Sequence, residues 1–452
     1  MGAVHIGLDI GTTNITMVVL DLEQQSVPSS RSIPNVRYQT GESYAYAQDP
    51  VAIEQAVRSL LAQVKQPIGS LCVTGQVHGI VYHDAAGKAV SPLYTWLDRR
   101  AMEAIDGVDS QHLLYEKTGV LLPSGYGLLA HYANRRLGKV PEESTGFCGI
   151  LEYVTGRLIG SVLDRSDPSC LGPFGAFDPV ASHFNSNVLQ EVFGSTEPRF
   201  LDSCTPFALA GYTPEGIPVA YPVGDNQAGF FGMVSDWQHS VLVSMGTSGQ
   251  LSLFSTDSNC PSSMELRPFL GEGFLHVGAT LTAGKAYETV QRFIASTIRS
   301  AGMDISDEAV FTLMKQTGQT EGKPGALQID TRLNGSRKDP AVRGSIRGID
   351  LDNLTLGNLV IGTIDGIVDE LHQFSTESGE RFAKMQRIIA TGSSVRKNPL
   401  FKDALGRAFR LPTTIAEVDD GAGFGAALIA AVATRALGRN ESRSLVGKLL
   451  GT

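Results

Sequence analysis

Short apolar runs alternate along the chain with longer segments in which apolar residues recur every three or four positions. Runs of the first kind predict β-strands and include residues 5–10, 16–22, 69–75, 79–84 and 240–246. Segments of the second kind predict amphipathic helices and include residues 49–64, 359–385 and 423–438. Strands and helices mixed along the whole chain predict the α/β fold class.

Two of the predicted strands open segments that resemble each other. The first is "HIGLDIGTTNITMVVLDLE", residues 5–23, and the second is "SVLVSMGTSGQLSLFSTDS", residues 240–258. Each predicts a strand, a Gly-Thr turn and a second strand, and Gly11 and Gly246 lie 246 − 11 = 235 positions apart. Such segments also arise by chance in β-containing proteins. Because the segments stand at the start of each half, a duplication and a chance resemblance are equally favoured. A duplication would place two phosphate-binding turns facing each other across one cleft.

The size and charge of the chain narrow the class of protein. With 452 residues the chain exceeds one ordinary hydrophobic core, so we expect two domains. A net charge of −9 disfavours a nucleic-acid partner, because phosphate backbones bind basic surfaces. No apolar run reaches the roughly 18 residues of a membrane-spanning helix. The five cysteines are widely spaced without a C-x-x-C pair, which indicates a reducing compartment, and we expect a cytoplasmic protein.

The turn that follows the first predicted strand, "DIGTTN", combines a carboxylate with glycine and hydroxyls. A glycine such as Gly11 lets the backbone approach a ligand closely, and consecutive N–H groups form an anion site. Asp9 would repel a phosphate unless a cation lay between them. One interpretation is therefore Mg²⁺, held mostly through water, beside a nucleotide phosphate. The other is an ordinary hairpin turn in which Asp9 is a capping group.

A second carboxylate stands beside glycine and small residues in "GDNQAG". Asp225 is predicted to lie at or near a helix N-terminus, where the helix dipole stabilises its ionised form. Such a carboxylate can accept the proton of an attacking hydroxyl during phosphoryl transfer, and Asn226 and Gln227 offer hydrogen bonds to sugar hydroxyls. Asp is also a favoured N-cap residue, so a purely structural role is the alternative.

Polar residues follow strand-like runs in three further motifs, "TGQVHG", "TWLDRR" and "ATGSSVRKNP". Gln76 and His78 end a predicted strand, a place that suits contact with a ligand, and Trp96 beside Asp98 and Arg100 suits a polyol. A structural histidine and a structural ion pair are the respective alternatives. The third motif, a strand, a small-residue turn and a helix, suits a nucleotide. Neither G-x-G-x-x-G nor a P-loop pattern occurs in the chain, which disfavours a Rossmann dehydrogenase and a P-loop kinase.

Taken together, the motifs resemble the FGGY family of carbohydrate kinases over essentially the whole chain. They occur in the family's order, as "GLDIGTTN", "TGQVHG", "TWLDRR", "GDNQAG", "SMGTSG" and "ATGSSVRKNP". The resemblance implies two ribonuclease-H-like domains of the actin-like ATPase fold, residues 1–234 and 235–452, with a catalytic cleft between them. It also implies an ATP-dependent kinase whose partners are a small sugar and ATP, with a homodimer as a family expectation.

The same resemblance implies a role for each motif residue. Asp225 would deprotonate the attacking sugar hydroxyl, and Asp9 together with Asp225 would place Mg²⁺. The residues expected to bind ATP are Gly11, Thr12, Thr13, Asn14, Gly246, Thr247, Gly392, Ser393 and Asn398. Those expected to bind the sugar are Gln76, His78, Trp96, Asp98, Tyr126 and Asn226.

The chain departs from the family pattern at several places. A Lys or Arg is usual shortly after the first turn, and here that position is Thr16. Leu129 and Tyr132 stand roughly where the family carries a Lys before a Trp, and Thr391 replaces the first glycine of a Gly-Gly pair. We therefore expect a divergent subfamily in which the usual cationic phosphate contact is missing from residue 16.

Within the family, "SGYG", "ILEYVTGRL" and "DRSDPSCLGPFGAFD" look most like sedoheptulokinases. The Gln-x-His motif fits xylulokinases equally well, and we rank a seven-carbon ketose ahead of xylulose as the sugar. Glycerol ranks lower, because Val77 and His78 stand where glycerol kinases have an Arg-Glu pair. Non-catalytic sugar or nucleotide sensors also share the fold. The presence of Asp225 favours an active kinase over a sensor.

Overall fold

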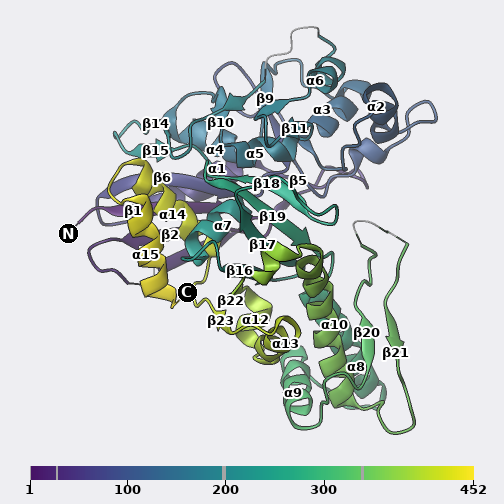
Figure 1. Cartoon of the computed structure of the whole chain (residues 1–452). Helices are drawn as coiled ribbons and strands as arrows, with labels where there is room; N and C mark the ends of the chain where they lie inside the picture. The colour runs from purple at the N-terminus through teal and green to yellow at the C-terminus, as the bar shows by residue number, and fades with distance from the viewer. Residues whose placement is uncertain (1, 27–28, 196–199, 337–338, 340, 452) are drawn as a thin grey trace. The chain divides into compact units, whose positions relative to one another are not determined.

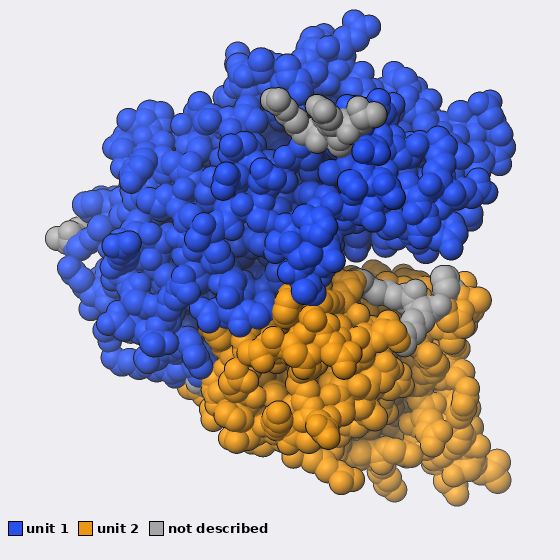
Figure 2. All heavy atoms as spheres, turned by 45° about the horizontal axis from the view of Figure 1, so that its top comes forward, with its two compact units in different colours: residues 1–235, 267–273, 418–449 blue, residues 236–266, 274–417, 450–452 orange. Residues whose placement is uncertain are grey.

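The computed structural model describes residues 2–26, 29–195, 200–336, 339 and 341–451, which form two compact units (Figure 2). Unit 1 consists of Met1–Ser235, Arg267–Gly273 and Val418–Leu449, and unit 2 of Asp236–Leu266, Phe274–Glu417 and Leu450–Thr452. The chain thus leaves unit 1 after Ser235 and returns to it twice. The domain limits predicted at residues 234 and 235 stay a prediction, because the units are interleaved along the chain.

A six-stranded sheet lies at the centre of unit 1 (Figure 1). Its strands are β1 (Val4–Ile10), β2 (Asn14–Asp21), β3 (Ser29–Pro34), β6 (Ile68–Gly75), β14 (Leu209–Tyr212) and β15 (Pro218–Ala220). They lie in the order β14-β15-β6-β1-β2-β3, and β1 pairs antiparallel with β2 and parallel with β6. Val4, Ile6, Leu8 and Ile10 alternate along β1 and are fully buried, which places the intervening Asp9 on the opposite face.

Glycines let helix α14 (Gly421–Ala433) pack closely against both the sheet and helix α7 (Asp225–Met233). A Cβ atom added to Gly7 of β1 would lie 1.9 Å from the carbonyl oxygen of Gly423. One added to Gly425 would lie 1.7 Å from the carbonyl oxygen of Ala228 in α7. A side chain at either glycine would therefore force the elements apart. The close packing of α14 on β1 and α7 is visible in Figure 1, where α14 is yellow.

Helix α1 (Pro50–Leu61) shows how the local sequence fixes an element of unit 1. The Asp49 carboxylate is the N-cap and accepts hydrogen bonds from backbone N–H groups of the first turn. Ile53, Val57 and Leu60 recur on one face of the helix and are buried. The sequence therefore specifies both the start of the helix and the face that it turns to the core.

A second part of unit 1 combines a small sheet with helices around an aromatic core. The strands are β4 (Arg37–Tyr38), β5 (Ala47–Gln48), β7 (Gly79–His83), β8 (Leu93–Thr95) and β9 (Gly146–Cys148), in the order β4-β5-β8-β7-β9. The helices of this part are α2 (Ser110–Thr118), α3 (Gly127–Arg136), α5 (Pro168–Leu171) and α6 (Ser186–Phe193). Helix α4 (Ile150–Ile159) packs with α1 and β6 in the core of the central sheet. Two-residue strands are β10 (Arg165–Ser166), β11 (Phe177–Asp178), β12 (His183–Phe184) and β13 (Asp202–Ser203). Tyr82, Phe147 and Phe174 pack together in this core.

Unit 2 is built around a sheet whose strands lie in the order β19-β17-β16-β22-β23. The strands are β16 (Ser240–Met245), β17 (Gly249–Ser255), β19 (Gly273–Ala279), β22 (Arg387–Thr391) and β23 (Thr413–Ile415). The helices are α8 (Gly284–Ser300), α9 (Asp307–Thr320), α10 (Leu356–Glu377), α11 (Glu380–Ala383), α12 (Ser393–Lys397) and α13 (Leu400–Phe409). A hairpin of β20 (Gln328–Asp330) and β21 (Ser345–Arg347) packs beside α10. Strand β18 (Glu265–Phe269) leads the chain back to unit 1, which ends in α15 (Arg439–Leu450).

The two units share one arrangement of strands. β16 pairs antiparallel with β17 and parallel with β22, as β1 does with β2 and β6. This shared arrangement supports the duplication suggested by the two Gly-Thr segments. The runs quoted above as predicted strands and helices lie in strands and helices, and the α/β prediction is confirmed. Within the ranges that the structure describes, no helix has the length and apolar character needed to cross a membrane.

Candidate active site

Three carboxylates of unit 1 interact where β1 ends and where α7 and α14 begin. Asp9 is the next-to-last residue of β1, and Asp225 is the first residue of α7. Asp420 is the N-cap of α14 and accepts a hydrogen bond from the Gly423 N–H at 2.8 Å. The Oδ1 atom of Asp9 is buried and has no hydrogen-bond partner among the described residues. Negative charge is thus concentrated at one place.

Desolvation raises the pKa of all three carboxyl groups. The pKa of Asp9 lies well above its ordinary value, because burial is reinforced by the charges of Asp420 and Asp225 and by a hydrogen bond with Asp420. The pKa of Asp420 is also raised by burial. The pKa of Asp225 is raised by desolvation, while the positive charge of Arg267 and the N–H of Asn226 oppose the rise. A cation bound beside these groups would relieve the repulsion.

The donor set fits Mg²⁺ that keeps much of its water. Carboxylate oxygens are the ligands that Mg²⁺ prefers, and the buried Oδ1 of Asp9 lacks a hydrogen-bond donor. Among the described residues, no three His, Cys, Asp or Glu side chains lie close enough to hold a metal by themselves. A magnesium ion at Asp9 would therefore complete its coordination with water and with ligand oxygens.

Asp225 has the exposure expected of a proton acceptor. Gly224 occupies the N-cap position of α7, and Asp225 Oδ1 accepts a hydrogen bond from the Asn226 N–H at 2.7 Å. Asp225 is open to solvent, although the protein around it desolvates its charge. The Gly224 N–H donates to Ser169 Oγ at 2.9 Å, which holds the start of the helix. Gly224, and not Asp225, is therefore the cap of this helix.

Asn35 holds the backbone of the first Gly-Thr turn. Its Nδ2 donates to the Gly11 carbonyl oxygen at 2.8 Å, and its own N–H donates to the Thr13 carbonyl oxygen at 2.8 Å. Thr13 and Asn14 are exposed at the tip of the hairpin. The turn is therefore preformed, with its exposed residues open to a ligand.

Side-chain hydrogen bonds tie the same turn to the predicted sugar residues. Trp96 Nε1 donates to Thr12 Oγ1 at 3.0 Å, and Thr12 Oγ1 donates to Gln76 Oε1 at 3.4 Å. Gln48 joins the two residues, because its Nε2 donates to the Thr12 carbonyl oxygen at 2.8 Å and its Oε1 accepts from Gln76 Nε2 at 2.7 Å. No sequence motif pointed to Gln48, which lies in the two-residue strand β5.

Thr16, where a cation was expected from the family pattern, is nearly buried in β2 opposite Asp9. Its Oγ1 lies 2.9 Å from Ser32 Oγ, and its hydroxyl also hydrogen-bonds with Asp420. A hydroxyl group therefore occupies the position of the expected cation, and it hydrogen-bonds to a carboxylate of the site. Asp9 itself is a residue of strand β1.

His78 and Tyr126 lie together in unit 1. Their ring centroids are 4.7 Å apart with an angle of 32° between the planes, and His78 Nδ1 lies 3.1 Å from the Pro173 carbonyl oxygen. Both residues are half-buried, and Tyr126 stands at the N-cap position of α3. The structure thus brings two of the predicted sugar residues into contact.

Asp98 lies in a buried ion pair. It is 3% exposed, and its two oxygens accept hydrogen bonds from Arg100 at 2.8 and 2.9 Å. Arg100 also donates to Asn134 at 2.6 Å and lies over the Tyr94 ring at 3.6 Å. This geometry matches the structural alternative for Asp98, and its contact with a sugar stays a prediction.

Arg267 brings a cation beside Asp225 from a segment that returns to unit 1. The neighbouring Pro268 carbonyl oxygen accepts a hydrogen bond from Gln227 Nε2 at 3.1 Å, which fixes this segment on α7. Burial lowers the pKa of Arg267, and the nearby groups Asp225 and Tyr126 oppose that change. No motif marks Arg267, because its surrounding sequence "ELRPF" has the appearance of an ordinary strand.

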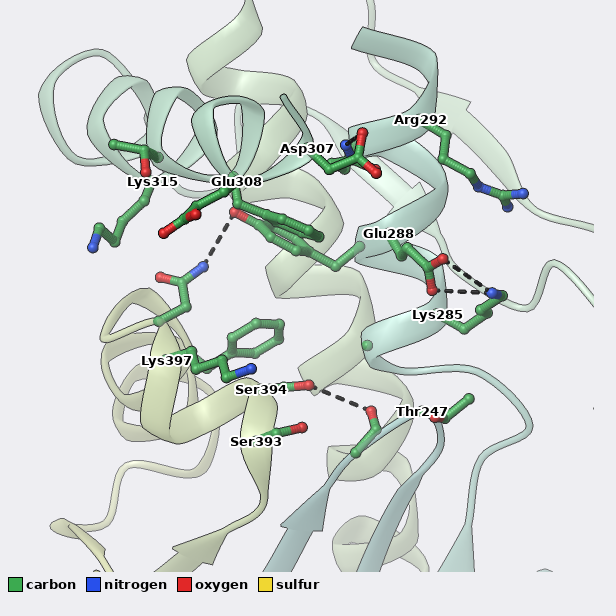
Figure 3. A pocket seen from close by; sticks show the side chains of 18 residues that line it. Thr247, Lys285, Glu288, Arg292, Asp307, Glu308, Lys315, Ser393, Ser394 and Lys397 are labelled. Carbon is green, nitrogen blue, oxygen red and sulfur yellow. Dashed lines mark hydrogen bonds and ion pairs between the residues drawn. The ribbon is translucent and has the colours of Figure 1, made fainter. Parts of the chain in front are cut away.

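Unit 2 holds a pocket of about 810 Å³ at the second Gly-Thr turn (Figure 3). Four residues predicted to bind ATP line it, namely Gly246, Thr247, Ser393 and Asn398. Gly392 precedes Ser393 with φ 99°, and a Cβ atom there would lie 2.3 Å from the Met245 carbonyl oxygen. Glycine is therefore required at residue 392. Further lining residues are Lys285, Tyr287, Arg292, Phe311, Lys315, Lys397 and Phe401.

Helix α8 begins directly on the second Gly-Thr turn. The Gly284 N–H donates to the Gly246 carbonyl oxygen at 3.0 Å, and the Lys285 N–H donates to the Thr247 carbonyl oxygen at 3.2 Å. Ser394 Oγ donates to the Gly246 carbonyl oxygen at 3.3 Å. Hydroxyls, lysines and the positive end of a long helix thus meet at the turn, a combination that suits a phosphate chain.

Known sequence families account for nearly the whole chain. The N-terminal domain of the FGGY family of carbohydrate kinases matches residues 4–232, and the C-terminal domain of that family matches residues 241–434. The chain therefore belongs to the FGGY family of carbohydrate kinases. It is an ATP-dependent sugar kinase with the actin-like ATPase fold, as the motifs predicted.

Individual relatives agree with the family over almost their full length. Sedoheptulokinase of Mus musculus is 25% identical, with 94% of this chain and 97% of the relative covered. Xylulose kinase of Staphylococcus xylosus is 23% identical, with 94% and 90% covered. The crystal structure of xylulose kinase from Rhodospirillum rubrum superposes with a TM-score of 0.81 at 19% identity, with 97% and 92% covered. The relatives are named for different sugars, so they support the family and not one substrate.

Proposed function

We propose that the chain transfers a phosphoryl group from MgATP to a terminal hydroxyl of a ketose, with sedoheptulose ranked ahead of xylulose. The similarity to sedoheptulokinase of Mus musculus and the "SGYG" motif support this order. One observation carries the proposal. Asp225 is an exposed carboxylate at the start of α7, and the charges of Asp9, Asp420 and Arg267 act around it. A homodimer and a cytoplasmic location remain predictions that accompany the proposal.

Asp225 accepts the proton of the attacking hydroxyl. Desolvation and the charge of Asp420 raise its pKa and make it a stronger base, while the positive charge of Arg267 favours its ionised form. Asp9 and Asp225 would hold Mg²⁺, which when bound neutralises charge on the phosphates. Most of the catalytic power of such a site comes from positioning and from charge placed in advance.

The remaining predicted residues bind the two substrates. Gln76 and Trp96 orient the sugar, and their hydrogen bonds to Thr12 couple its position to the first turn. The remaining proposed sugar ligands are His78, Asp98, Tyr126 and Asn226. The proposed phosphate and nucleotide ligands are Gly11, Thr12, Thr13, Asn14, Gly246, Thr247, Gly392, Ser393 and Asn398.

A coupled assay of ADP release over a panel of sugars tests the proposal. The panel contains sedoheptulose, xylulose, ribulose, gluconate and glycerol, each with ATP and Mg²⁺. We expect the highest kcat/KM with sedoheptulose and the second highest with xylulose. A higher value with gluconate or glycerol would overturn the ketose assignment. Sugar-independent ADP release with every compound would contradict the kinase itself.

A further inference from the structure

Side chains of opposite charge lie beside the two Gly-Thr turns. Asp9 stands just before the first turn, and Thr16 takes the position where the family usually has a Lys or Arg. Lys285 stands on the second turn and belongs to the pocket predicted for ATP. A phosphate chain needs cationic or N–H donors, since its oxygens carry the charge. Lys285 is therefore a candidate phosphate contact within the pocket of unit 2.

The backbone fixes Lys285 against the turn. Lys285 is the second residue of α8, and its N–H donates to the Thr247 carbonyl oxygen at 3.2 Å. A Cβ atom on the preceding Gly284 would lie 2.5 Å from the Gly246 carbonyl oxygen, so the helix begins in close contact with the turn. The backbone of Lys285 is therefore hydrogen-bonded to Thr247, a residue predicted to bind phosphate.

The ammonium group of Lys285 forms an exposed ion pair with Glu288. Its Nζ lies 3.0 and 3.1 Å from the two oxygens of Glu288, one turn further along α8. The side chains of both residues are about two-fifths exposed, at 44% and 43%. Such a surface ion pair contributes little stability and is readily replaced by a stronger partner. Figure 3 shows Lys285 on the side of Thr247 and Lys315 at the opposite side of the same pocket.

We propose that the Lys285 ammonium leaves Glu288 and binds the terminal phosphate oxygens of the nucleotide. The proposal rests on the kinase function proposed above. Lys285 has three N–H donors on a flexible stem, so it can serve as a mobile point charge for phosphate. Glu288, which lines the same pocket, is left to solvent when Lys285 moves.

Calorimetric titration with AMP, ADP and a non-hydrolysable ATP analogue tests the proposal. Titrations are made in EDTA, so that no divalent ion takes part. We expect Lys285→Met to lower the affinities for ADP and for the ATP analogue by about 10- to 30-fold, because one charge-assisted contact is lost. The affinity for AMP should be unchanged. The matched control is Lys323→Met, which removes an exposed lysine of unit 2 that does not line the pocket and should leave the affinities for all three nucleotides unchanged.

The outcomes separate this proposal from the kinase function on which it rests. If the unaltered protein binds no nucleotide, the nucleotide pocket and Lys285 both fail. If the unaltered protein binds nucleotide, but Lys285→Met lowers the affinity for AMP as much as that for ADP or leaves the affinity for ADP unchanged, only the role of Lys285 is overturned. Glu288→Gln gives a second test, because it frees Lys285 and should tighten ADP binding. Weaker ADP binding in Glu288→Gln would contradict the exchange.

Discussion

The two Gly-Thr turns are set in the same framework but surrounded by different chemistry. In unit 1 the end of β6 places Gly75 at φ 137°, where a Cβ atom would lie 2.4 Å from the Ile10 carbonyl oxygen. In unit 2 the residue after β22, Gly392, has φ 99° and the corresponding clash with Met245 at 2.3 Å. A glycine beside each turn thus lets a parallel strand approach closely. The backbone solution is the same in both units.

The side chains at corresponding positions of the two units differ in chemistry. Asp9 in β1 pairs with Thr74, and the corresponding residue of β16 that pairs with Thr391 is Ser244. One frame therefore presents a carboxylate and the other a hydroxyl. Carboxylates suit a metal ion and a proton acceptor, whereas hydroxyls with Lys285 suit phosphate oxygens. On the same backbone, the side chains beside each turn therefore add different chemistry to phosphate binding.

The largest expected effect falls on the base of unit 1. Asp225→Asn keeps the shape of the side chain but removes the proton acceptor, so we expect kcat to fall by about 10²- to 10⁴-fold. The coupled ADP assay measures the loss. Asp304→Asn, an exposed carboxylate of unit 2, is the matched control and should retain full activity. Substantial turnover in Asp225→Asn would mean that another group takes the proton.

Asp9→Asn tests whether the first turn serves a metal ion. We expect the Mg²⁺ concentration needed for half-maximal activity to rise by about 10- to 100-fold, the range seen when groups around a metal site are changed. Titration of activity with MgCl₂ at fixed free ATP measures this requirement. An unchanged requirement for Mg²⁺ would remove Asp9 from the proposed metal site.

The same variant has an expected signature in stability. Because the pKa of Asp9 is raised on folding, the group favours folding below the ordinary Asp pKa, and this contribution is lost as pH rises through the raised pKa. Without divalent ions, Asp9→Asn should unfold at a higher temperature than the unaltered protein at pH 7. The difference should shrink towards pH 4. Thermal melts across this range check the sign, and a difference independent of pH would contradict the charge repulsion.

A smaller effect is expected at the link between turn and sugar residues. Gln48→Leu leaves the Thr12 carbonyl oxygen and Gln76 Nε2 without their buried partner. We expect a loss of about 2–3 kcal/mol in the free energy of unfolding, together with a lower kcat/KM for the sugar. Urea unfolding and steady-state kinetics measure the two changes. Gln55→Leu, on the exposed face of α1, is the control, and equal losses in both variants would show that the link is unimportant.

The smallest effect is expected from Trp96→Phe. The change keeps an aromatic ring but removes the Nε1 donor to Thr12, a single bond of 3.0 Å at a residue that is 46% exposed. We expect kcat/KM for the sugar to fall by about 3- to 10-fold, the value of one neutral hydrogen bond. Trp237→Phe alters the other tryptophan of the chain and should leave kcat/KM unchanged.

Much of this picture was accessible from the sequence because it depends on local patterns. The apolar runs predicted β1, β6 and β16, and the motifs predicted Asp9, Asp225 and the second Gly-Thr turn. Asp420 and Arg267 were missed for a physical reason. Both come to the first site through tertiary packing, in segments that return to unit 1 late in the chain and whose local sequence shows only a helix start or a strand.

One set of calorimetric titrations tests most directly whether Asp225 acts in proton transfer and Lys285 in nucleotide binding. Asp225→Asn and Lys285→Met are each titrated with ADP and with the ketose that gives the highest turnover. We predict that Asp225→Asn binds both ligands as the unaltered protein does, while Lys285→Met keeps the ketose affinity and loses ADP affinity. If Lys285→Met loses ketose and ADP affinity alike, or if Asp225→Asn loses ADP affinity, Asp225 does not act only in proton transfer or Lys285 only in nucleotide binding.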